Sequence, residues 1–420
     1  MWTSKNNSGW NKVATTPMSS HNNSNYGHIY ATLYGLTVIN YIPQRPTNTC
    51  THRLAVIYGH TISVLLIVVL PIYFARNISA LTEAHDQRGQ LLLLVNFANT
   101  LLKYVTVVVT YVANFAHYAA IRAVTRRRQQ LEDDFNSSLQ VQPVYDERPR
   151  RQFETMLLFK FGLINAMMAV QVANILYQHC TGAHPVRVYI AVYTFVLWNY
   201  TENMADYFYF INSSAMKFYQ QLNQQLRQVV REAKLLHYFR MRGQRRGTVP
   251  HLCGLLCERL DTLAQRYQQI NRLCQDSLTM HQFQILGLIF ITLVSNLTNS
   301  FILFNLFVKH SQARASPAIV LNALHAIIFY VDTYIVALVS ENISLELRNI
   351  NQTLRQFNQV SELDVRLQQT IECFTLFVTN NHVEVRICGL FVLDRSLTYL
   401  TAATALSYFI TLVQFDLNLM

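Results

Sequence analysis

The sequence predicts an all-α membrane protein whose chain crosses the bilayer seven times. Its 420 residues are 51% hydrophobic and only 14% charged, whereas soluble domains carry about 25% charged residues. Apolar stretches of about 20 residues, the length that crosses a bilayer as a helix, recur between charged connections. Together these observations indicate that lipid, rather than water, surrounds most of the chain.

The first predicted span covers residues 54–74 and follows a polar segment, 1–53, without the pattern of a secretion signal. This helix is therefore expected to insert as its own signal. The fourth span is interrupted by Asn199, Glu202, Asn203 and Asp206, which predicts a polar face turned into the helix bundle. The other spans are expected at 91–118, 156–177, 188–211 (the fourth), 283–308, 318–340 and 396–415.

Lys and Arg residues are concentrated in alternate connections, and this predicts the orientation. They gather in the N-terminal segment, between the second and third spans, and between the fourth and fifth spans. Positively charged connections stay in the cytoplasm. The N-terminus is therefore expected to be cytoplasmic and the C-terminus extracellular, the reverse of a G-protein-coupled receptor. The net charge of +11 is interpreted as this topology signal, and no nucleic-acid partner is expected.

The connection at about 213–282 shows apolar residues at three-and-four spacing. This pattern predicts amphipathic helices that extend the fourth and fifth spans into the cytoplasm, with a break at 243–250. Residues 345–377 repeat the pattern. Such apolar faces pack on one another or on neighbouring subunits, and the sequence leaves both open.

No enzymatic motif is present in the sequence. The seven cysteines are scattered, and Cys253 and Cys257 lie one helical turn apart without a second pair of metal ligands. There is no glycine-rich phosphate loop and no nucleophile elbow. We therefore expect no enzymatic activity, no metal and no cofactor.

The most specific signal lies near the C-terminus. The chain reads Val-Arg-Ile-Cys-Gly-Leu-Phe-Val-Leu-Asp-Arg over 385–395, and later Ser-Tyr, five residues, then Gln-Phe over 407–415. This closely resembles the insect gustatory receptor family, whose signature is Thr-Tyr, five mostly hydrophobic residues and Gln-Phe, preceded by Gly-Leu-Phe-x-Leu-Asp. The departures are Ser407 in place of Thr and the polar Thr411 among the five.

The resemblance implies a ligand-gated, non-selective cation channel in contact chemosensation. It implies a homotetramer, or a heterotetramer with related receptors, in the plasma membrane of a sensory-neuron dendrite. The expected parts are a cytoplasmic N-terminal segment (1–53), a six-helix ligand-binding bundle with its cytoplasmic helices (54–340), cytoplasmic anchor helices (341–395), and a pore helix with a short extracellular tail (396–420).

Under this resemblance, the last helix lines the pore and presents a stripe of polar and aromatic side chains. Polar groups partly replace the hydration shell of a permeating cation, and an apolar ring can close a pore by dewetting. The alternative is that Ser, Thr and Gln bind neighbouring helices through hydrogen bonds. The candidate pore and gate residues are Thr404, Ser407, Tyr408, Thr411, Gln414 and Phe415.

A small-molecule tastant is expected to bind among the outer halves of the first six spans. Aromatic and polar side chains there are candidates, although such residues also serve as core or as interface belts. The candidates are Gln171, Asn174, Tyr193, Trp198, Asn299, Phe304, Asn322, His325, Phe329 and Asp332. Asp332 and Lys103 lie inside spans, where ionisable residues are rare, and we expect them first of all to pair with each other.

The ligand class is narrowed by one residue. The sugar-receptor branch of the family commonly carries Glu after the signature Tyr, and this chain carries Phe409. A bitter or other non-sugar tastant is therefore the preferred prediction. An insect odorant-receptor-type channel subunit and a metabotropic seven-helix receptor are the alternatives, and the charge pattern opposes the second.

Overall fold

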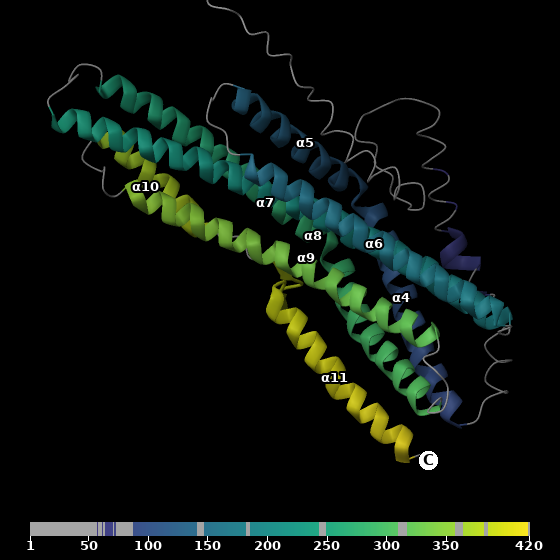
Figure 1. Ribbon diagram of the computed structural model, residues 1–420. Coiled ribbons are helices and arrows are strands. Elements are labelled where there is room, and N and C mark those ends of the chain that lie inside the picture. The colour runs from purple at the N-terminus through teal and green to yellow at the C-terminus, as the bar shows by residue number, and fades with distance from the viewer. Residues whose placement is uncertain are drawn as a thin grey trace, which may run out of the picture. The chain divides into compact units, whose positions relative to one another are not determined.

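A computed structural model describes residues 87–140, 147–181, 185–242, 249–309, 317–357, 364–381 and 385–418, with a few positions between 57 and 72. Within these ranges the chain is almost entirely helical (Figure 1). The elements are the π-helix η1 (Leu65–Val69), α4 (Gln87–Ala116), α5 (Tyr118–Gln140), α6 (Arg148–Cys180), α7 (Pro185–Met241), α8 (Val249–Lys309), α9 (Pro317–Arg355), α10 (Val365–Asn380), β1 (Arg386–Ile387), β2 (Phe391–Val392) and α11 (Arg395–Asn418).

Five of the described helices are long and apolar enough to cross a bilayer, judged by length and composition. They contain the stretches Leu94–Ala116, Arg148–Cys180, Val249–Phe304, Ile319–Arg355 and Arg395–Leu417. These match the second, third, fifth, sixth and seventh predicted spans. The first predicted span lies largely outside the described residues. The fourth lies in α7, where Glu202 and Asp206 lower the apolarity, so seven crossings and their orientation stay predictions.

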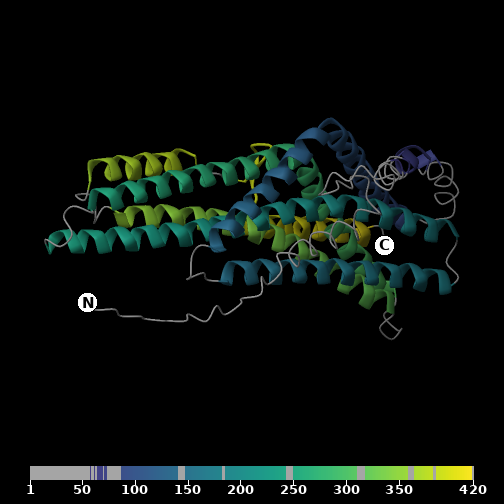
Figure 2. The ribbon, with the colours of Figure 1, turned by 90° about the horizontal axis from the view of Figure 1, so that it is seen from above.

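The helices α7 and α8 extend well beyond the length of a membrane span. They contain 57 and 61 residues, and the connection between them falls within the predicted break. Their extended ends pack against each other, with Leu222, Leu226 and Leu260 each 0% exposed. Figure 2 shows these ends beside α9 and α10. At these positions, then, the apolar stripes pack within one chain.

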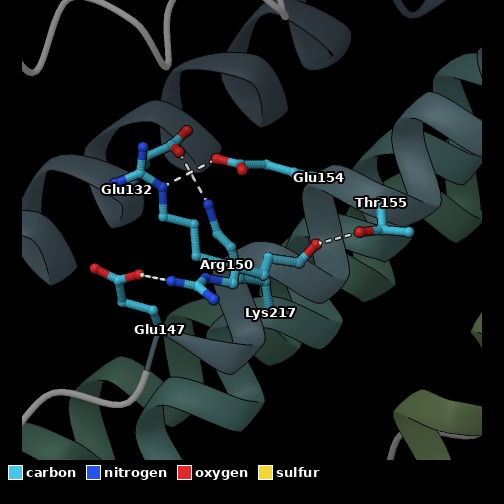
Figure 3. A network of polar contacts seen from close by, with 7 residues as sticks. Glu132, Glu147, Arg150, Glu154, Thr155 and Lys217 are labelled. Atoms are coloured by element: carbon cyan, nitrogen blue, oxygen red, sulfur yellow. Dashed lines mark hydrogen bonds and ion pairs between the residues drawn. The ribbon is translucent and has the colours of Figure 1, made fainter.

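A helix that the sequence pattern does not predict, α5, is fixed to α7 by a carboxylate that binds two cations. Glu132 accepts hydrogen bonds from Lys217 Nζ at 2.9 Å and from Arg128 Nη1 at 2.8 Å. Figure 3 shows the Glu132–Lys217 pair near the more exposed pair of Arg150 and Glu154, whose atoms lie 3.0 Å apart. The ring of Phe135 stacks on Phe218 one turn away, with centroids 5.5 Å apart. Ile121, Val124 and Leu131 of α5 are also buried, so this helix is held by apolar and ionic contacts together.

The charges around Glu132 predict an acid-sensitive stability. Burial opposes ionisation of this carboxyl, but Lys217 and Arg128 outweigh it and lower its pKa to about 2. An unfolded Glu has a pKa of about 4.3, so the ionised form stabilises the folded state by about 3 kcal/mol at neutral pH. Because the folded pKa is the lower one, this contribution is complete above about pH 4.5 and is lost as the pH falls toward 2.

Glu132→Gln is therefore expected to lower the free energy of unfolding by about 3 kcal/mol at pH 7 and by about half as much at pH 3. The measurement is chemical unfolding of the purified protein in detergent at both pH values. Glu154→Gln is the matched control, because its pair with Arg150 is exposed at the surface and such pairs contribute about 0–1 kcal/mol. Equal losses for the two variants, or equal losses at both pH values, would contradict the prediction.

The Gly-Leu-Phe-Val-Leu-Asp sequence forms the hairpin that precedes α11. Arg386 pairs with Val392 and Ile387 with Phe391. Gly389 occupies the turn with φ +71, a left-handed conformation that glycine adopts without a steric penalty. Ile387, Leu393 and Leu397 pack against Phe208 of α7 and Ile285 of α8. The signature therefore attaches the start of α11 to the helix bundle.

Two polar contacts fix the first turn of α11. Asp394 Oδ1 accepts a hydrogen bond from the backbone N–H of Leu397 at 3.0 Å, which satisfies one of the free N–H groups at the helix start. The Arg395 guanidinium donates to both carboxylate oxygens of Glu341 in α9, with Nε 2.6 Å from Oε2. Figure 1 shows α11 starting at the hairpin beside the middle of α9. These contacts connect the bundle directly to the last helix.

Candidate functional site

Predicted ligand residues line one face of α6 and one face of α9 where these helices meet. Asn322, His325, Phe329 and Asp332 recur at three-and-four spacing on α9, so they share a face. On α6, Met167, Gln171 and Asn174 recur in the same way. At one level of this seam, Asn174 Nδ2 donates to Asn322 Oδ1 at 3.4 Å.

An aromatic layer occupies the next level of the seam. The Trp198 ring of α7 lies edge-on to His325 at 6.2 Å and to Phe329 at 6.3 Å, between ring centroids. His325 and Phe329 stack at 6.1 Å, and Met167 packs against Trp198 and Phe329. We call Met167, Trp198, His325 and Phe329 the aromatic layer. Four residues from three helices thus meet. Trp198, His325 and Phe329 were predicted from the sequence as ligand-binding residues, and Met167 was not.

Three polar atoms in or next to the aromatic layer are buried without a hydrogen-bond partner in the described part of the chain. They are Trp198 Nε1, His325 Nδ1 and Gln171 Oε1. Leaving such atoms unsatisfied costs free energy. A mostly apolar site with a few polar atoms seeking partners has the chemistry of a small-molecule site. The aromatic layer is accordingly the strongest candidate for ligand contact.

A charged cluster follows the aromatic layer, one helical turn further along the seam. Lys160 of α6 is 0% exposed, and its Nζ donates to both oxygens of Asp332 at 2.6 Å. Asp206 Oδ1 of α7 lies 3.0 Å from the same ammonium and forms an ion pair with it, although the angles between these atoms do not allow a hydrogen bond. The expected Lys103–Asp332 pair is therefore wrong. Lys103 instead interacts electrostatically with Glu202.

Sequence reasoning missed Lys160, although it stands alone among apolar residues of the third predicted span. Its position inside a span would have indicated a functional or paired residue, because a lysine within the membrane pairs with a buried carboxylate. The polar stripe predicted on the fourth span does turn inward: Glu202 is 6% exposed and Asp206 is 0% exposed.

The remaining ligand candidates lie apart from the aromatic layer. Tyr193 of α7 is buried and stacks on Tyr189, with centroids 6.3 Å apart. Phe304 of α8 lies edge-on to Phe409 of α11 at 6.3 Å, so it contacts the last helix. Asn299, also on α8, is half-buried.

The predicted pore residues lie on the open side of α11. Ser407, Tyr408, Thr411, Gln414 and Phe415 are exposed, and Thr404 is half-buried. The opposite side of the helix is covered, with Thr398 3% and Ala405 7% exposed.

The chain matches the family described as 7tm chemosensory receptor over residues 25–419. It belongs to that family. This receptor is 46% identical to Gustatory receptor 10a of Drosophila melanogaster over 400 residues, covering 94% of each chain. It is 24% identical to the Drosophila protein named Gustatory receptor for bitter taste 22e over 160 residues, 38% of this chain and 41% of that one. Both relatives are insect gustatory receptors, as the C-terminal signature predicts. The family is one of receptors, in agreement with the prediction that the chain is not an enzyme.

The receptor also shares its fold with a solved structure, the insect olfactory receptor OR5 from Machilis hrabei in complex with eugenol. The TM-score is 0.59 at 11% sequence identity, over 94% of this chain and 99% of that chain. At this identity the likeness concerns the fold, and it supports the predicted all-helical receptor architecture.

Proposed function

We propose that this receptor is a ligand-gated cation channel of contact chemosensation, assembled as a tetramer with α11 around the pore. The observation that carries the proposal is the uncovered face of α11, where small and polar side chains recur among exposed apolar ones such as Leu400 and Ile410. Under this proposal the chain crosses the plasma membrane seven times, with the N-terminus in the cytoplasm and the C-terminus outside.

One stripe of α11 contains Ser396, Ala403, Ser407 and Gln414, all exposed. Their spacing places them on a single side of the helix, opposite Ala405. A glutamine amide exposed to hydrocarbon is unfavourable. Closed rotational symmetry around this stripe would give these side chains a water-filled path instead of lipid. A tetramer thus explains both the exposure and the polarity.

A second stripe beside the first contains Thr404, Tyr408, Thr411 and Phe415, of which Tyr408 is 56% and Phe415 is 61% exposed. Large rings at the edge of a pore-facing stripe can pack between subunits or close the path by dewetting. Gln414 and Phe415 are adjacent, so a rotation of α11 by about 100° would exchange an amide for a ring in the proposed path. We assign the gate to this pair.

The proposed ligand is a bitter or other non-sugar small molecule that binds at the aromatic layer. Trp198, His325 and Phe329 offer flat apolar surfaces with unsatisfied nitrogen atoms, which favour aromatic or heterocyclic compounds over polyhydroxylated sugars. The bitter-taste relative adds support of limited extent, since it aligns with 38% of the chain. The ligand gates the channel only if it binds the open state more tightly than the closed one.

An olfactory-type channel subunit is the second candidate function. The fold shared with the insect olfactory receptor favours it, whereas the extended similarity to a gustatory receptor favours contact chemosensation. The two candidates differ in ligand, so a panel that contains bitter compounds, sugars and volatile odorants separates them.

The test is whole-cell current from cells that express the chain, challenged with this panel. Ser407→Cys and Gln414→Cys place thiols on the proposed pore face, and Ala405→Cys is the matched control on the buried face. We expect a charged, water-soluble thiol reagent to block the current of the first two variants only. The Gln414→Ala, Phe415→Ala double variant should alter conductance or gating at matched surface expression.

Block of the Ala405→Cys variant alone would place the pore on the other side of α11. A response that requires G proteins and carries no intrinsic current would overturn the channel proposal.

A further inference from the structure

A cavity lies between α11 and the helix bundle, and it shares no lining residue with the aromatic layer. It lies among α7, α8, α9 and the first turns of α11. Its volume, traced by the centre of a water-sized sphere, is about 60 Å³. One water needs about 10–15 Å³ on this measure, so the cavity holds several waters or one small organic molecule.

The walls of this cavity are mostly hydrocarbon. The apolar surface comes from residues of all four elements, among them Phe208, Ile285, Ile289, Val336 and Leu397. Threonines also line it, but the hydroxyls of Thr292, Thr333 and Thr401 donate to backbone carbonyls of their own helices. These hydroxyls therefore seek no further acceptor. Water alone would be poorly satisfied along such walls.

Two carboxylates line the same cavity, and they differ in what they bind. Asp332 holds the Lys160 ammonium through both oxygens. Glu202 is 6% exposed, and its Oε2 is buried without a hydrogen-bond partner in the described part of the chain. A buried carboxylate oxygen without a donor is costly. The cavity thus has one acceptor that the described residues leave unsatisfied.

The charges of the groups around Glu202 also favour a positively charged occupant. Glu202 interacts electrostatically with Asp332, Asp206, Lys160 and Lys103. Of these five groups, Glu202, Asp332 and Asp206 are carboxylic acids and Lys160 and Lys103 are amines, so a third cation is needed before all three carboxylates can be ionised with balancing charges. An occupant with one positive charge would balance the described cluster.

We propose that this cavity binds a small protonated aliphatic amine. Its ammonium group donates to Glu202, and its hydrocarbon part packs against α8 and α11. A metal ion fits less well, because it needs several oxygen ligands and most of the lining is apolar. A neutral hydrocarbon would fill the space and leave the Glu202 oxygen unsatisfied, and an anion would be repelled by it.

The position of the site connects its occupancy with the last helix. Leu397, Thr398 and Thr401 of α11 form one wall, and Ala337 of α9 forms another. An amine between them would contact both α9 and the start of α11. The site is distinct from the aromatic layer, so it stands whether or not that layer binds a tastant.

The experiment reads binding directly and needs no current. The purified full chain in lipid nanodiscs is photolabelled with an aliphatic primary amine that carries a diazirine, and labelled peptides are identified by mass spectrometry. The alcohol of the same skeleton is the neutral comparison, and excess cyclohexylamine is the competitor. We expect competed labelling by the amine on peptides that contain 285–292 and 393–401, and roughly tenfold less by the alcohol.

Two variants test the two parts of the site. Glu202→Gln keeps the shape and removes the charge, so it should lower amine labelling roughly tenfold and leave alcohol labelling unchanged. Ala337→Leu keeps Glu202 and fills the cavity, so it should lower labelling by both probes. Glu154→Gln removes a carboxylate from the surface pair with Arg150 and should change neither.

Amine labelling that is equal in Glu202→Gln and the unchanged chain, with both monodisperse, would overturn the proposal. So would alcohol labelling as strong as that of the amine, or labelling that survives Ala337→Leu. Because no step requires an ion current, failure here leaves the channel proposal intact, and a silent channel leaves this site intact.

Discussion

Lys160→Met is expected to lower the free energy of unfolding by about 3–5 kcal/mol, because it leaves Asp332 and Asp206 buried without the cation between them. The Lys160 ammonium is the only group in the described chain that forms ion pairs with both of these carboxylates. In a membrane interior, water cannot replace it. The measurement is the fraction of monodisperse protein that survives heating in detergent, read by fluorescence-detected gel filtration.

A compensating variant separates loss of charge balance from loss of packing. Lys160→Met combined with Asp332→Leu and Asp206→Asn removes the carboxylates together with the cation, and we expect it to recover much of the lost stability. Arg151→Met is the matched control, since its pair with Glu147 is exposed at 78% and 62%. If the triple variant were less stable than Lys160→Met, the charges could not be the main cause.

Arg395→Ala and Glu341→Ala are each expected to reduce the ligand-evoked current roughly tenfold, within the usual range of coupling between sites. This prediction rests on the proposed channel function. The bidentate contact between Arg395 and Glu341 connects α9 to the first turn of α11. The same α9 carries His325 and Phe329. Through this contact, a change in α9 packing would reach the first turn of α11 directly.

The charge-swapped variant, Arg395→Glu with Glu341→Arg, tests this contact by rescue. We expect it to recover most of the current, because a contact acting through charge tolerates exchange of its partners. Surface expression should be similar in all three variants, since both side chains are partly exposed, at 43% and 25%. Full current in Arg395→Ala, or failure of the swap at normal surface expression, would count against a coupling role.

The last helix and its starting point could be predicted from the C-terminal signature alone. Local properties sufficed there: the length of the apolar stretch specifies a spanning helix, and the Gly389 turn with the Asp394 cap specifies where it starts. The five apolar helices and the continuous extensions of α7 and α8 follow from the same kind of local periodicity. The helix α5 was not predicted, because its few apolar positions lie among many charged ones, and one of its attachments is an ion pair with Lys217, 85 residues away from Glu132.

Which buried polar side chains contact one another depends on the tertiary packing of the helices. Helical periodicity predicts that Asp332, His325 and Phe329 share a face, and they do. It does not predict which helix meets that face, since every amphipathic span offers a face of the same kind. The partner of Asp332 is 172 residues away in Lys160 rather than in Lys103, because the rotation and order of packed helices are set by side-chain fit across the whole bundle. The same packing leaves Glu202 facing a cavity beside α11.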